Sequence, residues 1–257
     1  MALVEYSLSN RVGYITLNRP EKRNALSPAM VSELQGAFQT AEADESAKVI
    51  VLRANGDAFC SGADIAYLQQ MRTFSFEENL ADSQHLKKLL LHIYTSQKVV
   101  IAKVQGPAVA GGCGLASVCD FIYSANEAKF GYTEVKIGFV PAIVTVFLLR
   151  KIGEAKSKEL LLTGKLITAA MAQEWGMVNR VVEKSALETE VNLFAQQLVA
   201  NTSAQSLTRT KRMIAEVQHL KLEEALDFAA HQNAEARTTE DYKKGIDAFL
   251  NKEELTW

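Results

Sequence analysis

The pattern of hydrophobic and polar residues divides the chain into two parts. In the first part, alternating or continuous apolar stretches that are typical of strands take turns with apolar residues at helical spacing. Strands are predicted at 4–8, 12–17, 48–53 and 99–104, and helices at 28–43 and 76–94. Two of the strands are each followed by a turn of small residues and a helix. The pattern therefore predicts βα units and a mostly parallel sheet, which is an α/β fold.

After about residue 154, helical periodicity dominates. The amphipathic stretches lie at 154–163, 168–175, 185–200, 203–217, 221–234 and 239–250, and only 177–182 has the pattern of a strand. No linker rich in proline, glycine or serine precedes the last helices, so we expect them to extend the fold rather than to form a separate domain. Amphipathic helices must bury one face, either on the body of the protein or on another subunit.

Length and charge narrow the classes of protein that fit this pattern. At about 150 residues per domain, 257 residues make one large domain or one domain with a small appendage. The formal net charge of −2 gives no basic footprint for nucleic-acid binding. No apolar run reaches the ~18 residues of a membrane span, and the first residues lack the features of a signal peptide. We therefore expect a cytoplasmic protein without nucleic-acid or membrane partners.

Cysteines, histidines and glycines do not form a metal or dinucleotide motif. Cys60, Cys113 and Cys119 form no C-x-x-C pair, and no histidine has a carboxylate or cysteine partner at metal-ligand spacing. Gly112-Cys-Gly114 begins like a dinucleotide fingerprint, but its sixth position is Ser117 and no acid follows about 20 residues later. We expect no metal site and no nicotinamide or flavin cofactor.

Two turns that each connect a strand to a helix are rich in small residues, at 58–64 and 106–116. Small residues let a ligand approach the backbone, and the N–H groups at the start of a helix carry partial positive charge. Two such turns are able to supply two amide donors to one ligand. They are equally typical of tight connections with no further role, and their spacing alone leaves both interpretations open.

A third candidate is Glu134, the one carboxylate in the mostly apolar and aromatic stretch 130–141. An acid in such surroundings is expected to have a raised pKa, as a general acid or base requires. From spacing alone, an ion pair with Lys136 or a cap on the following turn is the favoured interpretation.

Together, these segments resemble the crotonase, or enoyl-CoA hydratase/isomerase, superfamily over nearly the whole chain. The resemblance rests on the segments 17–26, 59–65, 110–116, 119–120, 130–134, 162–164, 172–178 and 247–250. The run 130–142, with 110–114 before it, is most similar to bacterial members assigned as methylglutaconyl-CoA hydratases.

The resemblance implies a ββα spiral with a helical C-terminal trimerisation region. We expect the spiral core at 1–195 and the oligomerisation region at 196–257, in a homotrimer or a hexamer. The expected substrate is an acyl-CoA. Coenzyme A enters as part of the substrate, and no separate cofactor is implied.

The resemblance also assigns roles to individual residues. The amides of Ala63 and Gly111 are expected to form an oxyanion hole for the thioester carbonyl, and Glu134 is expected to be the catalytic acid or base. Phe249 and Lys252 are expected to complete a neighbour's pocket. The full set of expected substrate-binding residues is Lys22, Arg23, Ala25, Ser61, Ala63, Asp64, Ile65, Gly111, Gly114, Phe249 and Lys252.

Two departures from the usual pattern affect the mechanism and the substrate. Gly114 stands where a second glutamate usually lies, so Glu134 alone is expected to move protons, with a water or another side chain filling the gap. Ala142 and Ile143 stand where many relatives carry glycines, which makes the acyl pocket bulkier and indicates a short or branched chain.

The leading hypothesis is an enoyl-CoA hydratase that adds water across C2=C3 of a short or branched enoyl-CoA, with methylglutaconyl-CoA as one candidate. Two alternatives stay open. One is a Δ3,Δ2-enoyl-CoA isomerase in which Glu134 moves a proton between C2 and C4. The other is a non-catalytic acyl-CoA-binding protein that has kept the fold.

Overall fold

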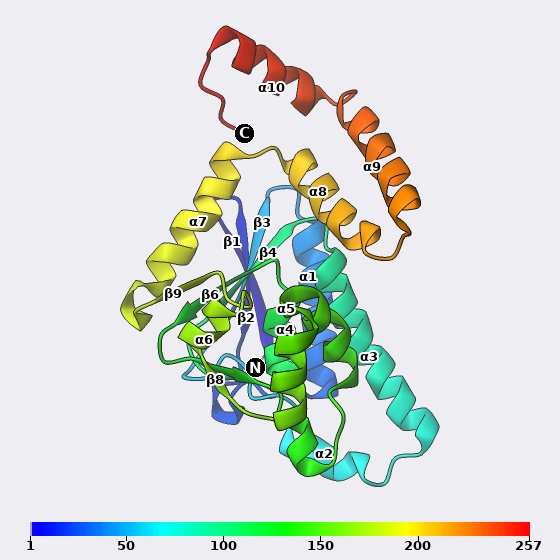
Figure 1. The fold of residues 1–257 in the computed structure, drawn as a ribbon. Helices are drawn as coiled ribbons and strands as arrows, with labels where there is room; N and C mark the ends of the chain where they lie inside the picture. The colour runs from blue at the N-terminus through cyan, green and yellow to red at the C-terminus, as the bar shows by residue number, and fades with distance from the viewer. Residues whose placement is uncertain (1) are drawn as a thin grey trace.

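A six-stranded sheet runs through the middle of the molecule, as the computed structural model of residues 2–257 shows (Figure 1). Its strand order is β1 (Val4–Ser9), β2 (Val12–Leu17), β3 (Val49–Ala54), β4 (Val99–Val104), β6 (Phe121–Ala125) and β9 (Arg180–Val182). Only the β1–β2 hairpin is antiparallel, and every other pair is parallel. A second, smaller sheet contains β5 (Ala108–Val109), β7 (Lys129–Gly131) and β8 (Ile167–Thr168). The predicted mostly parallel sheet is confirmed.

The helices connect these strands and continue beyond the last one. Their bounds are α1 (Pro28–Ala43), α2 (Ile65–Met71), α3 (Phe76–Thr95), α4 (Gly111–Ser117), α5 (Ala142–Thr163), α6 (Ala169–Glu174), α7 (Leu187–Asn201), α8 (Ala204–Val217), α9 (Leu222–Ala236) and α10 (Glu240–Asn251). Short 3-10 helices lie at η1 (Pro20–Lys22), η2 (Glu134–Ile137) and η3 (Lys184–Ala186). Helix α1 begins where its sequence predicts, since the Ser27 side chain accepts a hydrogen bond from the Met30 amide and Pro28 is the first helical residue.

Both faces of the large sheet are covered, which explains why its strands are almost continuously apolar. Along β3, Ile50 and Leu52 pack in the cluster that contains buried residues of α1 and α3, while Val49 and Val51 pack in the cluster that contains α7. Successive side chains of a strand point to opposite faces, so a strand buried on both sides needs apolar residues at every position.

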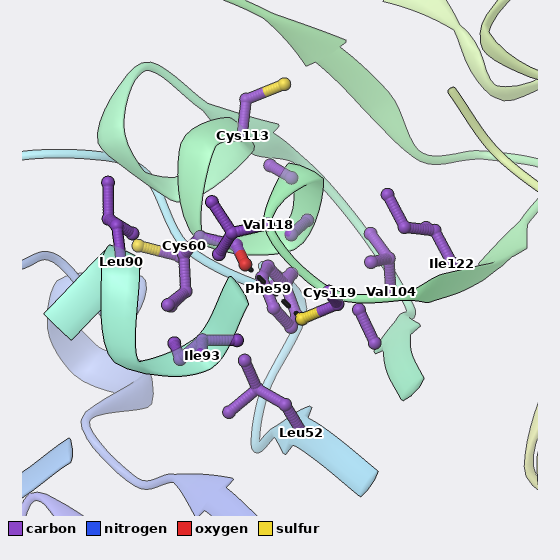
Figure 2. Packing of buried hydrophobic residues seen from close by; sticks show 14 of the residues in the cluster. Leu52, Phe59, Cys60, Leu90, Ile93, Val104, Cys113, Val118, Cys119 and Ile122 are labelled. Atoms are coloured by element: carbon purple, nitrogen blue, oxygen red, sulfur yellow. Dashed lines mark hydrogen bonds between the residues drawn. The ribbon is translucent and has the colours of Figure 1, made fainter. Parts of the chain in front are cut away.

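The three cysteines lie within the first of these clusters (Figure 2). All are buried and free, and burial raises the pKa of each thiol to about 12. The Sγ of Cys119 donates to the carbonyl of Leu115 at 3.4 Å. The cysteines therefore act as small hydrophobic residues that fill the core.

The structure corrects several predicted elements. Strands β6 and β7 were not predicted, and β9 covers only the last three residues of the expected strand 177–182. Helix α5 begins at Ala142 rather than at residue 154, because it continues on both sides of a kink at Gly153, where φ is 74° and ψ is 174°. That glycine interrupts the apolar periodicity, so the sequence pattern shows only the second half of the helix.

The C-terminal helices make few contacts with the body of the same chain. Helix α8 is fastened by Lys211, whose ammonium group donates to Asp120 at 2.7 Å and to the carbonyls of Ile93 and Lys98 at 3.2 and 3.0 Å. Helix α9 contains no buried residue, and α10 contains only Ala248. Large apolar side chains of these two helices are exposed, namely Leu222, Leu226, Ile246, Phe249 and Leu250.

The expected division at 195/196 falls inside α7, whose buried residues from Leu187 to Val199 pack against the large sheet. The helices that leave the body of the chain therefore start at α8. Among residues 2–257, no helix is both long and apolar enough to span a membrane.

Candidate active site

A cavity of about 320 Å³ lies where the two turns of small residues meet the start of α5. Its walls come from the start of α1, the turn 61–65, helices α2 and α3, the turn before α4, η2 and the first residues of α5. The volume is about ten times the ~30 Å³ that one molecule of liquid water occupies, so the cavity has room for a short acyl chain and a water molecule. Ala63, Gly111 and Glu134 all line it.

The amide of Ala63 is left free by the way its turn pairs with the loop before α1. Leu26 and Ala63 form a parallel bridge in which the Leu26 amide donates to the Gly62 carbonyl at 2.7 Å and the Asp64 amide donates to the Leu26 carbonyl at 2.9 Å. In such a bridge the backbone groups of the middle residue point to the opposite side. Within residues 2–257, the Ala63 amide has no hydrogen-bond acceptor.

The amide of Gly111 is free because it opens a helix. Gly111 is the first residue of α4, and the first N–H groups of a helix have no acceptor in the helix itself. The preceding residue, Ala110, has a positive φ of 51° and donates its amide to the Gly131 carbonyl at 2.8 Å, which fixes the turn against β7. The described part of the chain offers the Gly111 amide no acceptor.

Glycines allow these two turns to approach each other. A Cβ on Gly62 would lie 2.9 Å from the Cβ of Ala110, and a Cβ on Gly112 would lie 2.2 Å from the carbonyl oxygen of Cys60. Neither contact is possible without movement of the backbone. The two free amides are therefore brought to one cavity by a close approach that larger residues would prevent.

Glu134 lies at the first position of η2 and is 9% exposed. Its Oε2 atom is buried without a hydrogen-bond partner in the described chain. Burial raises the pKa of this carboxyl group, as expected, although a hydrogen bond from its own amide opposes the shift. The expected alternative of an ion pair with Lys136 is not observed among residues 2–257, since the aliphatic part of Lys136 lies beside Gly164.

Position 114 is closed by an apolar side chain. A Cβ on Gly114 would lie 2.3 Å from Cγ1 of Val144, which comes from the first turn of α5 and also lines the cavity. Val144 is thus the side chain that fills the space next to Gly114. Ala142 and Ile143 line the same wall of the cavity.

The expected coenzyme-side residues gather around the first turn, with different exposures. Lys22 and Arg23 are exposed, Ala25 is buried, and Ile65 is 76% exposed. The carbonyl of Arg23 accepts the Ser61 amide at 3.1 Å, which ties this loop to the turn. This backbone hydrogen bond, and not only side-chain contacts, therefore fixes the position of the loop relative to the cavity.

Asp64 is placed in the turn, but its carboxylate is occupied by the protein. It accepts from Arg19 at 2.6 Å and from the amides of Ala66 and Tyr67 at 2.8 and 3.4 Å, so it caps α2. Burial by itself would raise the pKa of Asp64, and the hydrogen bonds from Arg19 and the two amides lower it overall. Its role in this structure is to position the turn.

Phe249 and Lys252 are not brought to the cavity of their own chain. Phe249 lies on α10 with 78% of its surface exposed, and Lys252 caps that helix. In Figure 1, α10 lies at the end of the molecule opposite to α2. Neither residue lines the cavity of its own chain.

The sequence pattern did not single out two polar residues of the cavity wall, Tyr67 and Asp82. The Tyr67 hydroxyl, on α2, donates to Oδ1 of Asp82, on α3, at 2.7 Å. Burial, followed by the hydrogen bond and the charge of Asp82, raises the pKa of Tyr67 to about 12. No spacing along the chain signals this pair, because the two residues come from different helices.

Comparison with known proteins places the chain in a family. Residues 7–257 match the model of the enoyl-CoA hydratase/isomerase family, and the chain belongs to that family. It is 43% identical over 241 residues to a Thermus thermophilus protein assigned provisionally as an enoyl-CoA hydratase, covering 94% of this chain and 95% of that protein. It is 33% identical over 244 residues to the crotonyl-CoA hydratase of Syntrophomonas wolfei, covering 94% of this chain and 92% of that protein.

A solved structure supports the same assignment. The enoyl-CoA hydratase of Mycobacterium smegmatis superposes with a TM-score of 0.93 at 32% identity, over 99% of this chain and 98% of that one. The ββα fold with C-terminal helices that the resemblance implied is thereby confirmed. The names of these three proteins do not mention methylglutaconyl-CoA, so that finer assignment stays a prediction.

Gly112→Ala tests the close approach of the two turns. The added methyl group meets the Cys60 carbonyl at 2.2 Å, so we expect a loss of about 1–3 kcal/mol in the free energy of unfolding, as for overpacking of a core. Gly36→Ala is the matched control, because nothing lies within 4 Å of its Cβ and it is helical, so a gain of about 0.5–1 kcal/mol is expected. Urea unfolding measures both, and a Gly112→Ala variant as stable as the parent would contradict the packing described.

Proposed function

We propose that this protein is an enoyl-CoA hydratase that adds water across the C2=C3 bond of a short or branched enoyl-CoA. The observation that carries the proposal is one cavity that combines two free backbone amides with a buried carboxyl group whose Oε2 atom has no partner among the described residues. The names of the similar proteins support the same reaction.

The two amides suit the charge that develops during hydration. When water attacks C3 of an enoyl thioester, electrons move toward the thioester oxygen, and the amides of Ala63 and Gly111 stabilise the resulting enolate. Each donor of this kind contributes about 2.7–4 kcal/mol to transition-state stabilisation. Glu134, whose pKa is raised by burial, would give a proton to C2 as the enolate collapses.

The wall formed by Ala142, Ile143 and Val144 supports a short or branched acyl group. Methylglutaconyl-CoA is one candidate, suggested by the resemblance of the run 130–142. Its acyl chain ends in a carboxylate, and no lysine, arginine or histidine of residues 2–257 lines the cavity. The cavity of one subunit therefore fits a neutral acyl group better. A dicarboxylic acyl group requires a cation from a neighbouring subunit.

A second candidate reaction is the Δ3,Δ2-isomerisation of an enoyl-CoA. The observation that favours it is Gly114, because Val144 occupies the adjoining space and a carboxylate at this position is absent. One base, Glu134, would then move a proton between C2 and C4. A non-catalytic binding role is disfavoured by the cost of burying the unpartnered Glu134 oxygen, which a binding protein has no reason to keep.

Coenzyme A would lie along the loop and turn that border the cavity. Lys22 and Arg23 are exposed cations of this region, and they suit the phosphates of the coenzyme. We place its adenine against Ser61, Ala63 and Ile65, with Ala25 and the Asp64 turn behind them.

The C-terminal helices would act between subunits. Their exposed apolar side chains are typical of an assembly interface. A homotrimer or hexamer would cover them and bring Phe249 and Lys252 to a neighbour's coenzyme.

Replacement of the buried acid tests the mechanism. Glu134→Gln keeps the shape of the side chain but holds no transferable proton, so we expect turnover of crotonyl-CoA to fall at least 100-fold with acyl-CoA binding retained. Glu127→Gln, at an exposed carboxylate, is the control and is expected to keep full activity. Steady-state kinetics and calorimetry give the two quantities. Unchanged turnover would remove Glu134 from the mechanism.

Isotope labelling separates the two candidate reactions. Wild-type protein incubated with a 2-enoyl-CoA in water enriched in ¹⁸O is expected to form a labelled 3-hydroxyacyl-CoA, since only hydration moves solvent oxygen into the product. With a 3-enoyl-CoA, conversion to an unlabelled 2-enoyl-CoA without any hydroxy product would support the isomerase instead. Mass spectrometry distinguishes the products.

The assembly has its own test. Light scattering is expected to give the mass of three or six chains, and Lys252→Ala is expected to raise KM about tenfold at constant kcat, because it removes binding that substrate and transition state share. Lys243→Ala, on the same helix and paired with Glu240, is the control. A monomer, or an unchanged KM for Lys252→Ala, would contradict this part of the proposal.

A further inference from the structure

Hydration of an enoyl thioester transfers two protons at two places. Water loses a proton as its oxygen bonds to C3, and C2 gains a proton as the enolate collapses. Glu134 carries out one of these two proton transfers. The position from which a second glutamate usually acts is closed, since Val144 packs against Gly114 with 2.3 Å between its Cγ1 and a Cβ built there. A second proton-transfer group must come from a different wall of the cavity.

We propose that Asp82 is this second group, the base that takes the proton from the attacking water, an inference that rests on the proposed hydratase function. Asp82 comes from α3 and lines the same cavity as Glu134. Among the described lining residues, these two are the only carboxylates, and none is a lysine, arginine or histidine.

The immediate partners of Asp82 suit a base. Within residues 2–257 no cation lies within 4 Å of its carboxylate, so no ion pair occupies it. The Tyr67 hydroxyl donates to Oδ1 at 2.7 Å, which orients the group and leaves Oδ2 for a water molecule. The Tyr67 ring is itself held by edge contact with Phe74, at 6.0 Å between centroids. Tyr67 is thus a positioning residue, and its pKa of about 12 keeps it a hydrogen-bond donor.

The two carboxyl groups lie in different environments, as an acid and base pair requires. Glu134 is buried, and burial favours its protonated form. Asp82 is only partly buried and accepts a hydrogen bond from the Tyr67 hydroxyl. The enclosed group therefore supplies the proton, and the more solvated group receives one.

The atoms and charges of the step balance. The Asp82 carboxylate accepts a proton from water while the oxygen of that water bonds to C3. The π electrons of C2=C3 move to the thioester, whose oxygen is held by the amides of Ala63 and Gly111. Protonated Glu134 then gives its proton to C2. The product is a 3-hydroxyacyl-CoA, and transfer of one proton from Asp82 to Glu134 through solvent restores the starting state.

The experiment compares Asp82→Asn with Glu134→Gln in two reactions. The first is hydration of crotonyl-CoA. The second is exchange of the C2 hydrogens of butyryl-CoA with deuterium from D₂O, which needs only Glu134 and the two amides. We expect Asp82→Asn to lower kcat for hydration at least 100-fold with KM within a few-fold and exchange retained, whereas Glu134→Gln loses both reactions.

Three further variants complete the design. Glu77→Gln, an exposed acid on the same helix, is the control and keeps both activities. Tyr67→Phe keeps the charge of Asp82 but releases its orientation, so a loss of about tenfold in kcat is expected. Asp82→Ala is expected to regain hydration on addition of formate, which a merely structural role would not show.

Hydration by Asp82→Asn at the wild-type rate would overturn the inference, and so would equal loss of hydration and exchange together with no rescue by formate. Either result leaves the hydratase proposal intact, provided that the wild-type protein hydrates crotonyl-CoA. Absence of hydration in the wild type, with every short enoyl-CoA tried, would instead overturn the proposed function and this inference with it.

Discussion

The close contact between two backbone turns is the constraint on which the rest of the site depends. Cys60 donates its amide to the Pro107 carbonyl at 3.2 Å and accepts the Val109 amide at 3.0 Å, so the turn after β3 is fastened directly to the strand that leads into α4. At this separation only glycine fits at position 112. The contact leaves the amides of Ala63 and Gly111 at one cavity. Because they belong to a backbone that this contact fixes, they are held more firmly than a solvent-exposed side chain would be.

The loop before α1 extends this rigidity to the side of the cavity where we propose that the coenzyme binds. Asn24, fully buried and with a positive φ of 54°, donates to the carbonyls of Asn55 and Ala58 at 2.9 Å each. Arg19 reaches Asp64 at the start of α2. These polar contacts are largely shielded from water, which strengthens them. The loop before α1, the turn 58–64 and α2 therefore form one unit. This unit carries both the proposed coenzyme-binding loop and Tyr67, which lines the cavity.

The elements of this site that have local sequence signals could be predicted from the sequence. The contacts that depend on the packing of distant residues could not. The strands at 4–8 and 12–17, the start of α1 at residue 28 and the two strand-to-helix turns have strong local signals, and each was predicted correctly. The raised pKa of Glu134 follows from its apolar neighbours. By contrast, β6 lacks a distinctive local pattern, and the kink at Gly153 hides the first half of α5. Two contacts join residues of different helices, namely Gly114 with Val144 and Tyr67 with Asp82. No spacing along the chain predicts either contact.

We propose that the two free amides polarise a bound thioester, and absorption spectroscopy tests this directly. Sorbyl-CoA is a short conjugated thioester whose absorption moves to longer wavelength when hydrogen bonds draw electrons to its carbonyl oxygen. Bound to the Glu134→Gln protein, in which turnover is expected to be at least 100-fold slower, sorbyl-CoA is expected to show that shift. Binding without any shift would mean that the amides of Ala63 and Gly111 do not meet the carbonyl, and the account of the site would fail.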